Sequence, residues 1–178
     1  MRMPIQGEKV LTMARNISYF ISLQKEPLPV DIDWVIKRFG VRIIYKDFPP
    51  AFDALITHSD AGYPLIIANS DKPPNRLRFS LAHEFGHYII PWHYWERVCL
   101  GKKPLHLESE YHLEVEANLF AGEMLMPYEK FYPLAIDPKV SVEEISTTFK
   151  TSVAAVKSRY GTILRYKEFY EEVSKENN

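Results

Sequence analysis

Two histidines four residues apart, with a glutamate directly after the first, are the strongest chemical signal in this chain. His83, Glu84 and His87 form the pattern His-Glu-x-x-His. On an α-helix, residues four apart share a face, with Cβ atoms about 6 Å apart. Neutral imidazole is a good zinc ligand, so both rings can point at one ion, and Glu84 can take a proton from a water held there. Because the pattern also arises by chance, its surroundings must support this interpretation.

The surrounding sequence predicts that the motif lies within a helix. Breaker residues at 71–75 precede it and Pro91 follows it, which predicts a helix over residues 76–90 with a broad apolar face. Gly86 costs such a helix about 1 kcal/mol relative to alanine. A glycine is expected there if another backbone or the metal ligands approach closely. The alternative is an ordinary helix whose two histidines face solvent or the core.

A catalytic zinc site needs a third protein ligand, and a second predicted helix, over residues 108–125, offers one. Glu114 and Asn118 are four apart and share a face beside its apolar stripe. Glu114 is therefore preferred as the third ligand, and Asn118 can hydrogen-bond a ligand from behind. Glu116 points elsewhere on the helix and is expected to be a solvated charge. The residues expected to face inward are Leu113, Ala117, Phe120, Ala121 and Leu125.

A residue that stabilises the oxyanion cannot be chosen from the sequence. The nearby candidates are His93, His106, His112, Tyr88, Tyr94 and Tyr111. The three histidines are expected in loops or at the surface rather than as metal ligands.

The two helices together resemble the signatures of the ImmA/IrrE family of metallo-endopeptidases. The first signature is Asn-Arg-Leu-Arg-Phe-Ser-Leu-Ala-His-Glu-Phe-Gly-His-Tyr-Ile-Ile, residues 75–90. The second is Glu-Val-Glu-Ala-Asn-Leu-Phe-Ala, residues 114–121, followed by Met-Leu-Met-Pro at 124–127. The similarity in organisation covers roughly residues 10–160, and the paired signatures are far more specific than His-Glu-x-x-His alone.

The resemblance implies a zincin-like peptidase core of the gluzincin type. His83, His87 and Glu114 would bind one Zn²⁺, with Glu84 as the general base. Two histidines and a carboxylate favour zinc, although Mn²⁺ remains open. Asn118 stands where related peptidases often carry aspartate.

The resemblance also implies a protein substrate. Characterised members of that family cleave a helix-turn-helix transcriptional repressor, in DNA-damage responses or in mobile-element induction. We therefore expect site-specific endopeptidase activity on such a repressor. The alternative is a regulatory binding module that sequesters a repressor without cleaving it. The intact Glu84 favours the enzyme, because a pure binder has no need for a base.

The rest of the chain predicts an α+β fold in which helices pack on a small antiparallel sheet of about three strands. Helical spacing covers residues 8–25, and a short helix from Asp31 to Phe39 follows. The β-rich runs are Val41–Tyr45, Ala54–Thr57 and Leu65–Ala68. The run Leu65, Ile66, Ile67 and Ala68 is the candidate substrate-binding edge, since an extended peptide can pair with an exposed strand.

Two parts are expected along the chain. Residues 1–140 form the peptidase domain, and residues 141–178 form a C-terminal helical segment packed on or appended to it. Residues 141–160 are typical of a helix-turn-helix, which leaves a DNA-binding regulator as a further alternative. The charge count argues against it, because six basic residues in 141–178 are balanced by six acidic ones. A neutral segment gains little from phosphate contacts.

The composition fits a globular protein with a sizeable core. The 178 residues are 46% hydrophobic and 25% charged, with a net charge of −1, so no global field attracts nucleic acid. Cys99 is the single cysteine, which excludes an intrachain disulfide. The sequence shows no secretion signal and no apolar run near the roughly 20 residues that span a bilayer. We expect a cytoplasmic protein without a membrane partner.

Overall fold

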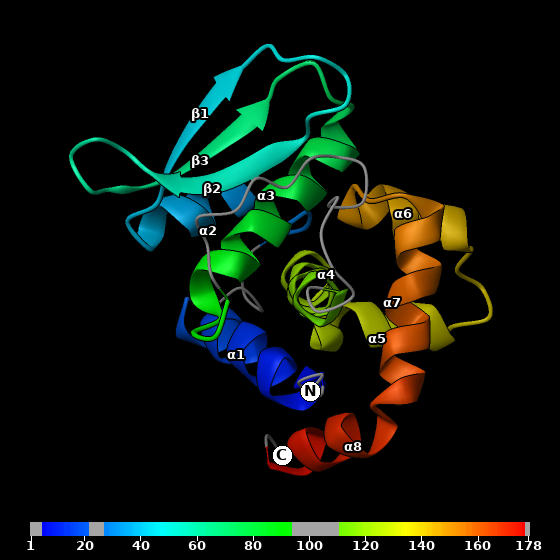
Figure 1. Ribbon diagram of the computed structural model, residues 1–178. Coiled ribbons are helices and arrows are strands. Elements are labelled where there is room, and N and C mark those ends of the chain that lie inside the picture. The colour runs from blue at the N-terminus through cyan, green and yellow to red at the C-terminus, as the bar shows by residue number, and fades with distance from the viewer. Residues whose placement is uncertain (1–4, 22–26, 94–110, 177–178) are drawn as a thin grey trace.

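The computed structural model describes residues 5–21, 27–93 and 111–176, which form a three-stranded sheet with helices beneath and beside it (Figure 1). The strands are β1 (Arg42–Lys46), β2 (Ala54–His58) and β3 (Pro64–Asn69). The helices are α1 (Gly7–Phe20), α2 (Ile32–Arg38), α3 (Pro74–Ile89), α4 (Tyr111–Leu125), α5 (Tyr128–Ile136), α6 (Val142–Phe149), α7 (Val153–Arg165) and α8 (Lys167–Glu176). The predicted α+β class is confirmed.

The sheet is mixed rather than antiparallel, which corrects one part of the prediction. The strand order is β1-β3-β2, and β3 runs parallel to β1 and antiparallel to β2. This order arises because the connection after β1 carries the chain past the neighbouring position to β2. β3 then enters the gap between β1 and β2. The buried Asn69 holds this connection, because its side-chain amide donates to the carbonyl oxygens of Phe48 (3.1 Å) and Phe52 (2.9 Å).

The central position of β3 also overturns the prediction that Leu65, Ile66, Ile67 and Ala68 form a substrate-binding edge. These residues pair with β1 on one side and with β2 on the other. A strand paired on both sides has no free row of N–H and C=O groups to offer a peptide. The edges of the sheet are β1 and β2.

The helices that precede and follow the sheet begin and end close to the expected positions. The side chain of Asp31 accepts a hydrogen bond from the backbone N–H of Trp34 (3.0 Å), which caps α2 as its sequence predicts. Gly40 follows that helix with φ +75°, a conformation suited to glycine. α3 has Pro74 as its first residue and ends before Pro91. Of the helix predicted over 8–25, residues 22–25 lie outside the described part.

The core surrounds α4, which runs through the centre of the molecule with α1 and α3 packed along it (Figure 1). All five residues predicted to face inward on α4 are buried. The ring of Phe120 meets that of Phe85 on α3 edge to face, with centroids 5.7 Å apart. α4 is buried on more than one side, so its acidic residues lie in a low-dielectric environment.

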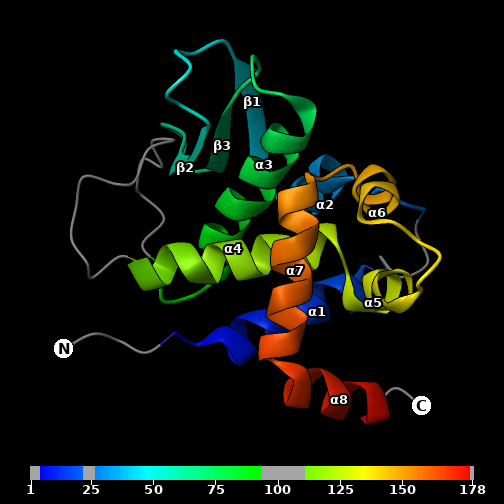
Figure 2. The ribbon, with the colours of Figure 1, turned by 90° about the vertical axis from the view of Figure 1, so that its right-hand side faces the viewer.

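In the C-terminal part, α7 crosses α4 (Figure 2). α6 begins with the predicted capping box, in which Ser141 and Glu144 exchange hydrogen bonds. The side chains of Val156, Arg159 and Ile163 on α7 are buried. The division of the chain at residue 140 stays a prediction.

One helix, α5, was not predicted, and α8 was expected only as part of the C-terminal helical segment 141–178, without bounds of its own. α5 contains Pro133, which the sequence pattern counts against a helix, and α8 is short and strongly polar. Tertiary contacts hold both of them, because the ring of Tyr170 on α8 stacks on that of Tyr128 on α5 with centroids 4.5 Å apart. Tyr170 is only 1% exposed.

Candidate metal centre

His83 and His87 lie one turn apart on the buried face of α3, as their spacing predicts. Their Nε2 atoms are 3.1 Å apart, and the side chains of both are largely buried. Two Nε2 atoms this close point at a common position rather than at separate partners. α3 therefore presents two nitrogen donors to one point in space.

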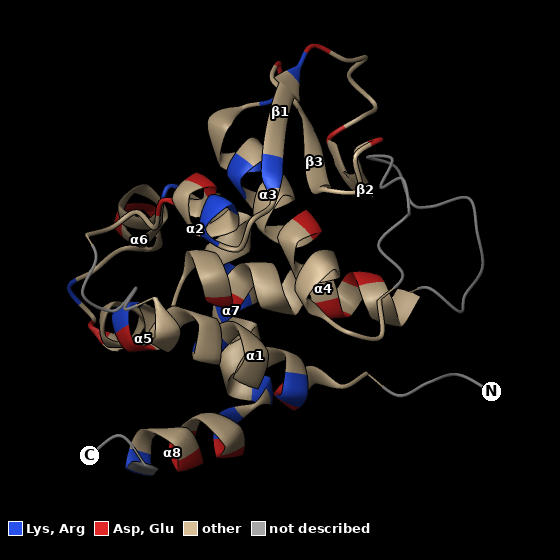
Figure 3. Ribbon diagram, turned by 90° about the vertical axis from the view of Figure 1, so that its left-hand side faces the viewer, with Lys and Arg blue, Asp and Glu red and all other residues tan. Residues whose placement is uncertain are grey.

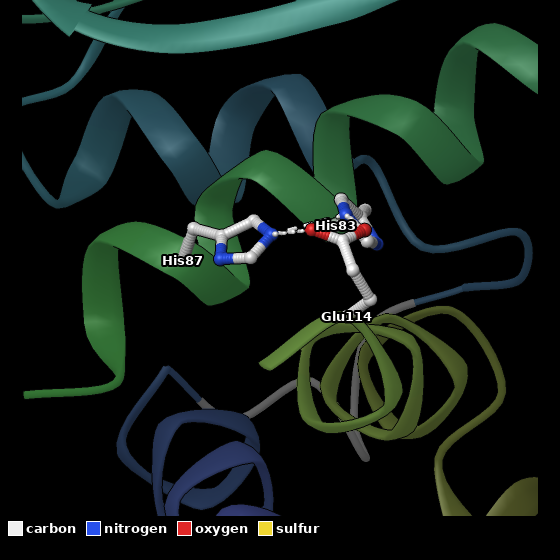
Figure 4. A group of neighbouring side chains, drawn as sticks. All are labelled: His83, His87 and Glu114. Atoms are coloured by element: carbon white, nitrogen blue, oxygen red, sulfur yellow. Dashed lines mark hydrogen bonds and ion pairs between the residues drawn. The ribbon is translucent and has the colours of Figure 1, made fainter. Parts of the chain in front are cut away.

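Glu114, in the first turn of α4, brings a carboxylate to the same point (Figure 4). Its Oε2 lies 3.3 Å from Nε2 of His83, and its Oε1 lies 3.5 Å from Nε2 of His87. A tetrahedral zinc ion with bonds of about 2.0–2.2 Å separates its ligand atoms by about 3.3–3.6 Å. The three side chains thus lie close to the spacing of a zinc ligand set, and the two Nε2 atoms, 3.1 Å apart, would move apart slightly around a bound ion. The Glu114 side chain is 32% exposed, so the site opens to solvent on one side.

The spacing of the two helices depends on Gly86. A Cβ atom built on Gly86 would lie 3.0 Å from Cδ1 of Phe120, which is tighter than an ordinary contact. The glycine therefore lets α4 approach α3 closely enough for Glu114 to reach the histidines. The expected reason for this glycine was a nearby backbone or metal ligand. The neighbour is instead the fully buried side chain of Phe120.

Charges at the site favour a cation. Burial lowers the pKa of His83, but hydrogen bonding and attraction to Glu114 outweigh it, so that pKa lies above its ordinary value. For the carboxyl group of Glu114, burial alone would raise the pKa. Its hydrogen bonds to the two histidines outweigh burial, so the pKa of Glu114 lies below its ordinary value. An anionic carboxylate beside two imidazoles stabilises positive charge at their meeting point.

Asn118 lies behind His83, where it was predicted. Nδ1–H of His83 donates to Oδ1 of Asn118 across 3.0 Å. This bond places the proton on Nδ1 and leaves the Nε2 lone pair directed at the metal position. The tautomer of His83 is therefore the one that a metal ligand needs.

His93 lies behind His87, which the sequence did not predict. The Nδ1 atoms of His87 and His93 are 2.9 Å apart, and Nε2 of His93 lies 2.9 Å from Oε2 of Glu116. His93 lies in the bend after α3, as expected of a loop residue, although it is buried. The prediction for Glu116 was wrong, because this side chain is fully buried rather than solvated. Helical phase placed Glu116 away from Glu114, but Trp92 and His93, directly after α3, lie against it.

Glu84, the predicted general base, is 1% exposed, and a strand of the sheet holds its carboxylate by a hydrogen bond. Its Oε2 accepts a hydrogen bond from the backbone N–H of Ile56 in β2 (3.0 Å). In an antiparallel pair, every second residue directs its N–H away from the partner strand. Ile56 therefore sends its N–H outward from the sheet toward Glu84, so the outer edge of β2 lies next to this carboxylate.

The oxyanion candidates are not resolved to one residue. His93 is bonded to Nδ1 of His87 and thus lies across that ring from the metal position. Tyr111 is 71% exposed, and the ring of Tyr88 stacks on that of Phe85. His112 has a buried Nε2 atom without a hydrogen-bond partner among the described residues. Tyr94 and His106 lie outside the described residues.

The fold and the site together define a zincin-like metallopeptidase domain, in which one helix carries His-Glu-x-x-His and the next supplies a carboxylate. The chain belongs to the family described as the IrrE N-terminal-like domain (Peptidase_M78), which matches residues 36–160. The resemblance to the ImmA/IrrE peptidases is thereby confirmed.

Among solved structures, the chain is similar to a Mycobacterium tuberculosis transcriptional regulator with a TM-score of 0.58. The two share 16% identity over 86% of this chain and 51% of that protein, so this chain spans about half the regulator's length. At this identity the likeness concerns the fold alone. A comparison with curated proteins found no match. Among the described residues, no helix combines the length and apolar character needed to cross a membrane.

Proposed function

We propose that this protein is a zinc-dependent endopeptidase that cleaves a helix-turn-helix transcriptional repressor at a specific site in the cytoplasm. The observation that carries the proposal is the convergence of His83, His87 and Glu114 on one point, with Glu84 following directly on the same helix. A protein that only binds needs neither a metal-ligand set nor an adjacent carboxylate. Two nitrogens and one carboxylate favour zinc, with Mn²⁺ as the alternative.

Each residue has a distinct task in this proposal. His83, His87 and Glu114 would hold the ion, which supplies Lewis acidity when bound. Glu84 accepts the proton of the attacking water and returns it to the leaving amine. The hydrogen bond from Ile56 fixes the direction of the Glu84 carboxylate during both transfers.

The substrate chain is proposed to pair with β2 rather than with β3. β2 is an edge strand, and its outer side lies next to Glu84. A peptide that extends the sheet there by main-chain hydrogen bonds would place a peptide bond near the general base. A cavity of about 420 Å³ between α3, α4 and α7 offers room for substrate side chains, since Asn118 and Phe79 line it beside His83.

Cleavage is tested by incubating the protein with the repressor encoded nearest to its own gene. The expected result is a new fragment that EDTA abolishes and that the Glu84→Gln variant does not produce. A stable complex without any fragment would support the alternative, a module that sequesters the repressor. Absence of both a fragment and a complex would refute a repressor as the partner.

DNA binding through residues 141–160 is disfavoured by two observations. Arg159 on α7 is buried and donates to Glu123 on α4, so it is not available to contact phosphate. The exposed charges of residues 141–160 are also balanced, with Lys150 and Lys157 against Glu143 and Glu144, and α8 beyond them carries both basic and acidic residues (Figure 3). A mobility shift with short duplex DNA at low salt would revive this alternative.

A further inference from the structure

A continuous chain of hydrogen bonds leads from the ligand His87 to a fully buried carboxylate. It runs from Nδ1 of His87 to Nδ1 of His93 (2.9 Å) and from Nε2 of His93 to Oε2 of Glu116 (2.9 Å). The side chains of His93 and Glu116 are both 0% exposed. Solvent therefore cannot replace either partner, and each bond is made within the protein.

The geometry allows only one arrangement of protons when His87 serves as a ligand. If Nε2 of His87 presents its lone pair to a metal, the ring proton is on Nδ1 and donates to Nδ1 of His93. That nitrogen must then be an acceptor, so the proton of His93 is on Nε2 and donates to Glu116. Each imidazole is thereby held in a single neutral tautomer.

Glu116 is fixed in place by other donors as well. Trp92 donates its indole N–H to Oε2 (2.6 Å), and the backbone N–H of Gln6 donates to Oε1 (2.7 Å). With Nε2–H of His93, three donors converge on this carboxylate, which therefore is a rigid acceptor at the end of the chain.

We propose that His93 and Glu116 are positioning residues that set the affinity of the site for its divalent ion. They orient the ring of His87 and hold its proton on Nδ1, so that Nε2 presents a lone pair to the ion. The negative charge of Glu116 also makes this lone pair a stronger ligand for the ion. The two histidine ligands are then held differently, because the chain behind His83 ends on the neutral amide of Asn118. This inference rests on metal binding by His83, His87 and Glu114, as in the proposed function.

The test measures metal affinity rather than cleavage. The full-length wild type and the Glu116→Gln variant are stripped of metal, and their affinities for Zn²⁺ are measured by competition with a chromophoric chelator. We expect the variant to bind about 10- to 100-fold more weakly. The visible absorption of the Co²⁺-loaded variant should also shift, since the ligand field of His87 changes.

A matched control separates positioning from general destabilisation. Glu123 is another fully buried carboxylate of α4, but its partners are Arg159 and Tyr170 rather than a ligand histidine. Glu123→Gln is expected to lower thermal stability while leaving the Co²⁺ spectrum and the Zn²⁺ affinity unchanged. Equal losses of affinity in both variants would overturn the proposal.

Two further variants keep the test decisive if Glu116→Gln does not fold. His93→Gln breaks the same chain and should weaken metal binding to a similar extent, with no additional loss in the double variant, because both residues act through His87. Trp92→Phe removes one donor to Glu116 and should cause a smaller loss. Wild-type affinity in these variants refutes the positioning role. A wild type that binds neither Zn²⁺ nor Co²⁺ would instead refute the metal centre and the proposed function.

Discussion

Gly86 on α3 and Phe120 on α4 are in such close contact that a methyl group on Gly86 would lie 3.0 Å from Cδ1 of the phenylalanine ring. Phe120 is fully buried, so its ring has no free space into which it can move. The separation of α3 and α4, and with it the distance from Glu114 to both histidines, therefore depends on one missing side chain.

We predict that Gly86→Ala lowers both stability and metal affinity. Alanine improves helix propensity by about 1 kcal/mol, but overpacking a core of this density costs about 1–3 kcal/mol. Chemical denaturation and Zn²⁺ titration measure the two effects. Gly161→Ala on α7 is the matched control, because a Cβ there meets no atom within 4 Å, and it should be neutral or stabilising. Unchanged metal affinity in Gly86→Ala would contradict the role assigned to this contact.

Removing Glu114, the third proposed metal ligand, should empty the site. We predict that Glu114→Ala purifies with far less bound metal than the wild type, because two imidazoles alone leave a zinc ion undercoordinated. Metal analysis of the purified proteins checks this directly. Glu129, an acidic residue of α5 that contacts Arg15, provides a control, and Glu129→Ala should retain its metal. Equal metal content in the wild type and Glu114→Ala would break the ligand assignment.

The role of Glu84 as general base can be tested separately from metal binding by replacing its carboxylate with an amide. Glu84→Gln keeps the size of the side chain and an oxygen acceptor for the N–H of Ile56, so we expect wild-type metal content and a similar melting temperature. Repressor cleavage should fall by at least about 10²-fold, the lower range for loss of acid–base catalysis. Cleavage at the wild-type rate by a metal-loaded Glu84→Gln protein would exclude the proposed mechanism.

The buried ion pair between α4 and α7 should be important for stability. The guanidinium of Arg159 donates to Oε2 of Glu123 (2.6 Å) and to the hydroxyl of Tyr170 (2.8 Å). Arg159→Ala removes the hydrogen-bonded counter-ion of the buried Glu123 carboxylate and leaves only Arg15, whose Nη1 lies 3.9 Å from Oε1. Loss of a partner from a buried pair costs about 3–5 kcal/mol in such cases, and Arg15 should keep the loss at the lower end of that range. Urea denaturation measures this loss. Arg165→Ala changes an exposed arginine of the same helix and should alter stability by less than about 0.5 kcal/mol. A comparable loss in both variants would mean that helix α7 itself, and not the ion pair, is sensitive.

The three predicted ligands could be found from the sequence because each depends on local geometry. A helix places residues four apart on one face, and the apolar stripe of α4 fixed the direction of Glu114. His93 and Glu116 could not be found in this way. Their contact depends on the turn after α3 that brings Trp92 and His93 against α4, and no periodicity in the sequence encodes that turn.

The sheet illustrates a similar limit. Short β-rich runs located all three strands, but their order depends on Asn69, whose side chain binds the backbone of the β1–β2 connection. The nearly continuous apolar character of Leu65–Ala68 was a usable signal for a central strand, because a strand covered on both faces does not alternate. α5, and the bounds of α8, could not be predicted because tertiary packing of Tyr128 and Tyr170 overrides weak local propensity.

α4 carries a carboxylate for each of two tasks. Glu114 belongs to the candidate metal centre and Glu123 to the ion pair with α7, nine residues and about 14 Å apart along one helix axis. The metal centre would fix the first turn of α4, whereas the ion pair with Arg159 fixes its last turn. Because the two ends of the helix are held by separate contacts, loss of the pair with α7 is expected to loosen the C-terminal helices and to leave the three metal ligands in place.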